Sequence, residues 1–123
     1  MTENISSNAF AYVGDAVIEL FVRRYLVETA KLKNPSDEAV KFVAATAQSD
    51  AFARIESALT EEEQDVYRRA RNNYHTSNVP KSATPAQYRR STGFEAVFGY
   101  LYLGGNESRA KELFCMAYGL EHI

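Results

Sequence analysis

Several absences in this sequence exclude whole classes of protein. Cys115 is the single cysteine, so no internal disulfide can form and a reducing compartment is expected. No apolar run approaches the length of a transmembrane helix, and the N-terminal MTENISSN has no basic region followed by an apolar stretch, as a secretory signal would. We therefore expect a cytoplasmic protein with no membrane association.

A further absence concerns secondary structure, because no segment alternates polar and apolar residues for long enough to predict a strand. Apolar residues instead recur at spacings of three and four, between start signals such as an N-cap at Ser36 and a capping box formed by Thr60 and Glu63. The predicted fold class is all-α, one domain with about five main helices, at 9–30, 36–58, 60–73, 85–103 and 106–119.

Acidic residues are missing from one long window, 66–94. The window contains six basic residues, Arg68, Arg69, Arg71, Lys81, Arg89 and Arg90. Because the whole chain carries −2, this window carries +6 and the remainder carries −8. Such a concentration predicts an edge that binds a polyanion, although a solvated helix face followed by a loop is the plainer interpretation.

Two apolar helical segments each contain an acid beside a small residue, Gly14-Asp15 in the first and Gly93-Phe94-Glu95-Ala96 in the second. Small residues, with Ala11 and Gly99 among them, would let the two helices approach closely. Asp15 and Glu95 would then face each other. Two close carboxylates repel unless a cation lies between them, and Mg2+ prefers such oxygen ligands. The alternative is that each acid pairs with a nearby arginine.

Glu19 lies four residues after Asp15 on the same helix face and is a candidate for a further carboxylate in such a metal site. The sequence has no convincing set of residues for nucleophilic catalysis. Cys115 lies in an apolar stretch and is expected in the core, and the two histidines are His75, in a polar loop, and His122, at the C-terminus. For His75 we expect a contact with the bound polyanion or a solvated position rather than general acid catalysis.

The segments YVGDAVIEL and TGFEAVFGYLYL resemble the two signature segments of the ribonuclease III family, in the expected order and separation. The short chain and the segment VPKSATPAQYRRSTGFEA resemble in particular its Mini-ribonuclease III branch, which has the catalytic domain and no double-stranded-RNA-binding domain. The resemblance implies a ribonuclease III fold, with a flexible tail at 1–8 and a catalytic domain at 9–123.

The resemblance also implies the chemistry, which is Mg2+-dependent cleavage of double-stranded RNA that leaves 5′-phosphate ends. Asp15 and Glu95 would be the catalytic metal ligands, with Mn2+ as a substitute metal. A homodimer is implied, as are 23S ribosomal RNA precursor as substrate and a ribosomal protein as a candidate helper. The residues expected to contact RNA are Arg68, Arg69, Arg71, His75, Lys81, Arg89 and Arg90.

Two departures from the family pattern leave the number of metal ions open. Full-length members carry a Glu at the position of Ala11 and an Asp at the position of Thr92. The reduced acid set motivates a second hypothesis, a catalytically idle factor for ribosome biogenesis that binds double-stranded RNA with the same fold. A third is a helical adaptor whose basic window binds an acidic protein.

Overall fold

The computed structural model describes residues 4–73 and 80–123, and within them the protein is helical with no strand. The elements follow one another as α1 (Ser7–Arg24), the π-helical turn η1 (Tyr25–Thr29), α2 (Ser36–Val43), α3 (Ala45–Ile55), the 3-10 turn η2 (Glu56–Ala58), α4 (Glu61–Asn72), α5 (Pro85–Leu103) and α6 (Glu107–Tyr118). The all-α prediction is confirmed.

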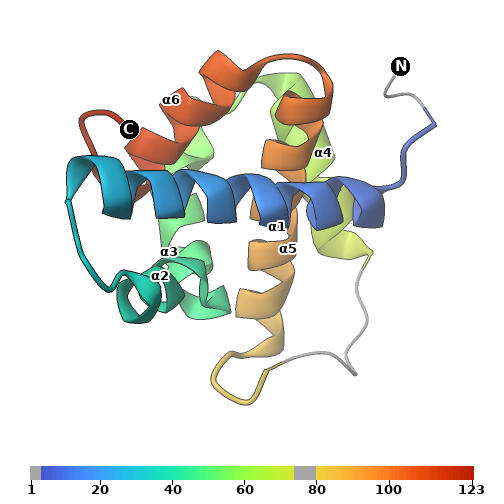
Figure 1. The fold of residues 1–123 in the computed structure, drawn as a ribbon. Coiled ribbons are helices and arrows are strands. Elements are labelled where there is room, and N and C mark those ends of the chain that lie inside the picture. Colours follow the sequence, from blue (N-terminus) through green and yellow to red (C-terminus); the bar gives the residue numbers. More distant parts are fainter. Residues whose placement is uncertain (1–3, 74–79) are drawn as a thin grey trace.

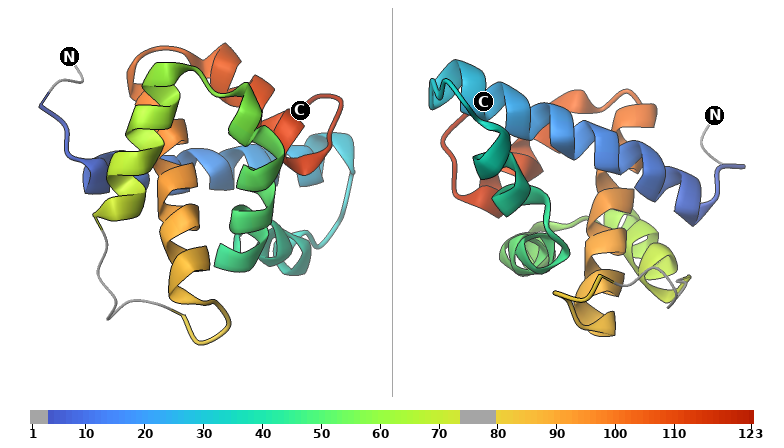
Figure 2. Two further views of the ribbon diagram at one scale, coloured as in Figure 1. Left: turned by 180° about the vertical axis from the view of Figure 1, so that it is seen from behind. Right: turned by 60° about the horizontal axis from the view of Figure 1, so that its bottom comes forward.

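Helix α5 runs through the middle of the molecule, and α1, α3, α4 and α6 pack around it (Figures 1 and 2). Its residues Phe94 and Phe98 are completely buried on one side of the helix, and Ala96 is completely buried on another. A helix that is apolar on all sides belongs in the centre of a fold. Among the described residues, no helix combines the length and the apolar character needed to cross a bilayer.

The closest contact between helices is the crossing of α1 over α5, which Figure 1 shows at the centre of the molecule. A Cβ atom added to Gly14 would lie 1.6 Å from the carbonyl oxygen of Glu95, and one added to Gly99 would lie 1.9 Å from the carbonyl oxygen of Phe10. The two backbones are therefore in direct contact, as the small residues predicted. Gly93 is different, because it faces the ring of Tyr67 on α4.

Most of the expected helix ends are confirmed. Thr60 and Glu63 form the capping box of α4, Pro85 occupies the first turn of α5, and Asn106 caps α6. Helix α6 ends at Gly119, whose φ of 66° is the left-handed conformation that favours glycine.

The predicted helix at 36–58 is wrong in one respect, because it is broken at Ala44, where ψ is 146°. The sequence there contains no glycine or proline, so the break depends on tertiary packing and not on a local signal. Its effect is to turn α2 away from α3. Two boundaries also shift: α2 starts at Ser36 with Pro35 as its N-cap residue, and α1 starts at Ser7, inside the expected tail.

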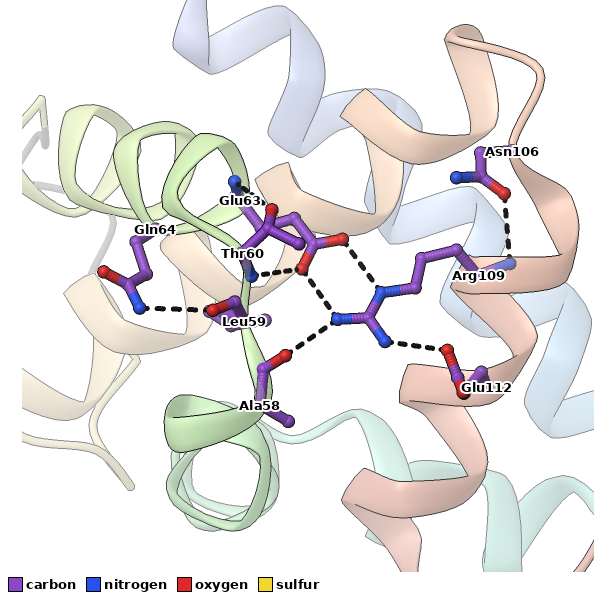
Figure 3. Close-up of polar contacts among 8 residues, drawn as sticks. All are labelled: Ala58, Leu59, Thr60, Glu63, Gln64, Asn106, Arg109 and Glu112. Carbon is purple, nitrogen blue, oxygen red and sulfur yellow. Dashed lines mark hydrogen bonds and ion pairs between the residues drawn. The ribbon is translucent and has the colours of Figure 1, made fainter.

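A buried ion pair joins the start of α4 to α6 (Figure 3). Glu63, only 3% exposed, accepts two hydrogen bonds from Arg109, at 2.9 and 3.0 Å, and one from the backbone N–H of Thr60. Arg109 also donates to the carbonyl of Ala58 and to Glu112. Burial raises the pKa of Glu63, but these hydrogen bonds outweigh burial, so its pKa lies below the usual value.

The glycine contact predicts an unusual sign for the substitution Gly14→Ala. Alanine normally stabilises a helix interior by about 1 kcal/mol relative to glycine. Here the added methyl collides with backbone that cannot rotate away, so we expect a loss of at least about 2 kcal/mol in the free energy of unfolding. Urea denaturation measures it, with the exposed Ala53→Gly on α3 as a control for helix propensity alone. Unchanged or increased stability of Gly14→Ala would contradict the contact.

Candidate functional site

Asp15 and Glu95 face the same pocket, which has a volume of about 580 Å3. Asp15 comes from α1, one residue after the glycine contact, and Glu95 comes from α5, where its own carbonyl makes that contact. The backbone crossing therefore fixes the separation of the two carboxylates. The other lining residues come from α1, the end of α2, α3, the 80–84 turn and α5: Asn8, Ala11, Tyr12, Val43, Ala45, Gln48, Pro80, Tyr88, Ser91 and Thr92.

The two carboxylates interact directly. Burial raises the pKa of Glu95 to about 9, together with the negative charge of Asp15 and a hydrogen bond between the two side chains, whereas the amide of Gln48 acts in the opposite direction. At neutral pH the metal-free pair therefore shares a proton that Glu95 holds. A divalent cation bound at the pair would offset the repulsion between the two carboxylates and favour loss of that proton.

The two positions that depart from the family pattern line this same pocket. Ala11 contributes only a methyl group, and the hydroxyl of Thr92 donates to the carbonyl of Tyr88 at 3.1 Å. No cluster of three or more potential ligands of the His, Cys, Asp and Glu types occurs in residues 4–73 and 80–123. The pocket therefore offers two carboxylates to a metal ion.

Glu19 does not join the pair, contrary to its expected place on the same face. It lines a separate pocket with Val27 and Val40, and its carboxylate accepts a hydrogen bond from Arg23 at 3.2 Å. Glu19 lies four residues beyond Asp15, which is about 6 Å farther along the helix axis. This distance places it past the edge of the carboxylate pocket.

The alternative that each acid pairs with an arginine is not what the structure shows. Within the part of the chain that is described, neither Asp15 nor Glu95 forms an ion pair with a lysine or an arginine. Two carboxylates in one pocket, with a proton between them and no basic partner, fit a hard divalent cation, which uses one or two protein carboxylates and several waters.

The expected basic residues divide into three groups. Arg71, Arg89 and Arg90 line a second pocket of about 570 Å3 between α3, α4 and α5. Arg68 and Arg69 both pair with Asp65 on the surface of α4. Lys81 is exposed and follows Pro80, which lines the carboxylate pocket. His75 lies outside the described residues.

The second pocket lies on a different side of α5 from the carboxylates. Arg71 lies over the ring of Tyr67, with its guanidinium carbon 5.5 Å from the ring centre, and Arg90 donates to the hydroxyl of Ser49 at 2.7 Å. The expectation that these arginines adjoin the carboxylate pair is therefore wrong, because α5 separates the two pockets. They still share one helix, and Arg89 precedes Glu95 by about 9 Å along the axis.

Gln48 is the pocket residue that the sequence analysis missed. Its side chain is 1% exposed and lies on α3, an element that had no expected role in the site. A signal was available, because Gln48 begins the stripe that continues with the buried residues Ala51, Phe52 and Ile55. An amide at the core position of such a stripe indicates a specific partner.

Comparison with known proteins shows the family of the chain. Residues 8–106 match the family described as "Ribonuclease III domain". The chain is 48% identical over 105 residues to the Mini-ribonuclease 3 of Symbiobacterium thermophilum, over 84% of this chain and 80% of that protein. It is 42% identical over 114 residues to the Mini-ribonuclease 3 of Streptococcus pneumoniae, over 89% and 88%.

A solved structure gives the same fold. The crystal structure of a Fusobacterium nucleatum protein superimposes with a TM-score of 0.82 at 29% identity, covering 95% of this chain and 94% of that one. The family match at 8–106 contains both carboxylates and all residues that line the two pockets.

The shared proton predicts how the stability of the metal-free protein depends on pH. The pKa of Glu95 is about 9 in the folded protein and its ordinary value is 4.5, so folding takes up a proton between these pH values and stability falls as the pH rises through them. The steepest expected loss is about 1.4 kcal/mol for each pH unit.

Glu95→Gln should remove this slope and unfold at a higher temperature than the wild type at pH 8 in EDTA. Thermal denaturation from pH 5 to pH 9 checks it, with Glu19→Gln as the control that keeps the wild-type slope. Parallel curves for the wild type and Glu95→Gln would contradict the shared proton.

Proposed function

Since the chain belongs to the ribonuclease III family and is therefore an endoribonuclease, we propose that it hydrolyses double-stranded RNA at the Asp15–Glu95 pair with the help of Mg2+. The observation that carries this proposal is the pair of carboxylates in one pocket, sharing a proton and lacking a basic partner. A bound Mg2+ supplies positive charge to the phosphodiester and acidifies the attacking water. Because only two carboxylates are available, one ion per pocket is the proposed stoichiometry.

The residues of the pocket have separate tasks in this reaction. Asp15 and Glu95 would hold the cation, and the glycine contact keeps their spacing constant. Asp15, on α1, is exposed and Glu95 is half-buried. A substrate would therefore reach the pair from the side of Asp15. A nucleophilic side chain is not required, because a water acidified by the bound cation would supply the attacking oxygen.

We further propose that the arginine pocket binds the RNA backbone. Arginine forks match phosphate geometry, and such contacts position a duplex without reading its sequence. Double-stranded RNA is recognised mainly by shape, because its major groove is too narrow for side chains. A duplex lying across α5 would then contact Arg71 and Arg89 on one side and the carboxylates on the other.

Members of the ribonuclease III family generally work as dimers, and we propose a homodimer here as well. Tyr12, Ala16 and Leu20 recur every four residues on α1 and are exposed, Tyr12 by 83% and Leu20 by 50%. This exposed stripe borders the pocket through Tyr12. A two-fold axis through it would place one pocket opposite each strand of the duplex.

The finer identity of the substrate is proposed from the family resemblance. We expect the precursor of 23S ribosomal RNA, cut at its paired ends in the cytoplasm, with Mn2+ able to replace Mg2+ and a ribosomal protein as helper. Mapping the 23S ends in cells that lack this protein would test the substrate, and normally trimmed ends would oppose it.

Cleavage of a long duplex RNA tests the proposed function directly. With Mg2+, the wild type should give discrete products with 5′-phosphate ends, and EDTA should abolish them. Asp15→Asn and Glu95→Gln should each reduce the rate at least about a thousandfold, which corresponds to about 4 kcal/mol of lost transition-state stabilisation. Glu19→Gln is the matched control on α1 and should remain active. RNA binding without cleavage in every condition would favour the idle ribosome-biogenesis factor.

Salt titration tests the arginine pocket. Arg89→Gln should weaken duplex binding for all sequences alike and reduce the slope of log K against log salt by about 1. Lys111→Gln removes the same charge from α6, at the other end of α5 from the 80–84 turn (Figures 1 and 2), and should keep the slope. Equal slopes for both variants would remove this pocket from the RNA interface.

Light scattering tests the dimer. The wild type should have twice the chain mass of 13.8 kDa, and Leu20→Lys should have the mass of one chain, because a charge replaces an apolar contact at the interface. Met116→Lys changes an exposed apolar residue on α6 and should remain dimeric. A wild type with the mass of one chain would contradict the proposal.

A further inference from the structure

Gln48 has a buried side-chain nitrogen without a hydrogen-bond partner, and it is the one such atom among the described residues. Its Nε2 atom has no acceptor within hydrogen-bond geometry, although the residue is 1% exposed. Leaving a buried donor unpaired destabilises a folded protein, so native structures rarely keep one without a use.

The position of this amide indicates what it serves. Gln48 lines the carboxylate pocket from α3, whereas Asp15 and Glu95 line it from α1 and α5. It lies against the Glu95 carboxyl and favours the charged form of that group. The reverse orientation of the amide would place its oxygen against the carboxyl oxygens, so electrostatics favours the N–H2 on this side.

The neighbouring residue shows that burial alone does not explain Gln48. Ser49 is also buried, at 3% exposure, but its hydroxyl accepts the hydrogen bond from Arg90 and it does not line the carboxylate pocket. Of two adjacent buried polar side chains, one is satisfied by the fold and the other is left facing the carboxylates.

We propose that Gln48 is a positioning residue, whose amide donates a hydrogen bond to the Glu95 carboxylate and fixes the oxygen that Glu95 presents to the divalent cation. This inference rests on the proposed function. In the metal-free protein Glu95 bonds to Asp15, and the Gln48 Nε2 atom lies near the Glu95 carboxyl without a well-formed hydrogen bond to it. With a divalent cation bound, Glu95 would be ionised, and its carboxylate would accept a full hydrogen bond from the Gln48 amide. Partners of metal ligands act in this way, and their loss typically weakens metal binding about 10- to 100-fold.

The variant Gln48→Met tests the inference, because methionine has nearly the same length and no donor. We expect at least a tenfold weaker affinity for Mn2+ alone, measured by calorimetry without RNA. We also expect a tenfold or larger fall in kcat with a KM for duplex RNA within twofold of the wild type. In EDTA its melting temperature should equal or exceed that of the wild type, because an unpaired buried amide has been removed. Gln48→Leu is a second variant without the amide, and Gln64→Met, the same change at an exposed residue of α4 outside both pockets, is the matched control.

The outcomes separate this inference from the proposed function. A wild type that neither binds Mn2+ nor cleaves RNA would overturn both. A wild type that does both, with a Gln48→Met variant that binds Mn2+ equally well, would overturn only the positioning role. A lowered melting temperature in EDTA with unchanged Mn2+ affinity for both Gln48 variants would show that the amide is structural, which also overturns it.

Discussion

The direct contact between the backbones of α1 and α5 is the constraint on which the rest of this structure depends. Gly14 and Gly99 are side-chain-free at the crossing, and each faces a carbonyl oxygen of the other helix. Because Asp15 follows Gly14 and Glu95 supplies one of those carbonyls, the contact that closes the core also sets the distance between the two carboxylates. The functional geometry is therefore part of the main packing of the fold and not an addition to its surface.

The central helix also organises the charge of the molecule. One side of α5 carries Glu95 toward the carboxylate pocket, and another carries Arg89 and Arg90 toward the arginine pocket. A single rigid element thus keeps the arginine side chains away from the carboxylates, and under the proposed function one RNA duplex would reach both. Direct salt bridges would neutralise the pair and leave it unable to bind a metal ion.

Much of the fold could be predicted from local signals, because the helix ends carry them. Thr60 and Glu63, Pro85 and Gly119 each act within a few residues along the chain, and each does what its pattern indicates. The break at Ala44 could not be predicted in this way, since no residue near it disfavours a helix and only packing decides it.

The same distinction applies to the site. The juxtaposition of Asp15 and Glu95 was visible in the small residues beside them, whereas the place of Glu19, the separation of the arginines from the carboxylates, and the part of Gln48 all depend on how helices are arranged in space.

The helices that line the carboxylate pocket are anchored to the core to very different degrees. Helices α1 and α5 are anchored by their backbones, but α2, which ends at Val43 on the pocket rim, contains no fully buried residue and contacts the core through the partly buried Ala39, Phe42 and Val43. Segments with so little buried surface open locally at a small free-energy cost, so the amide hydrogens of α2 should exchange with solvent well before those of α5. Under the proposed function, a wall beside α2 that opens while the carboxylate wall stays fixed would let a bulky duplex enter the pocket without changing the spacing of the two acids.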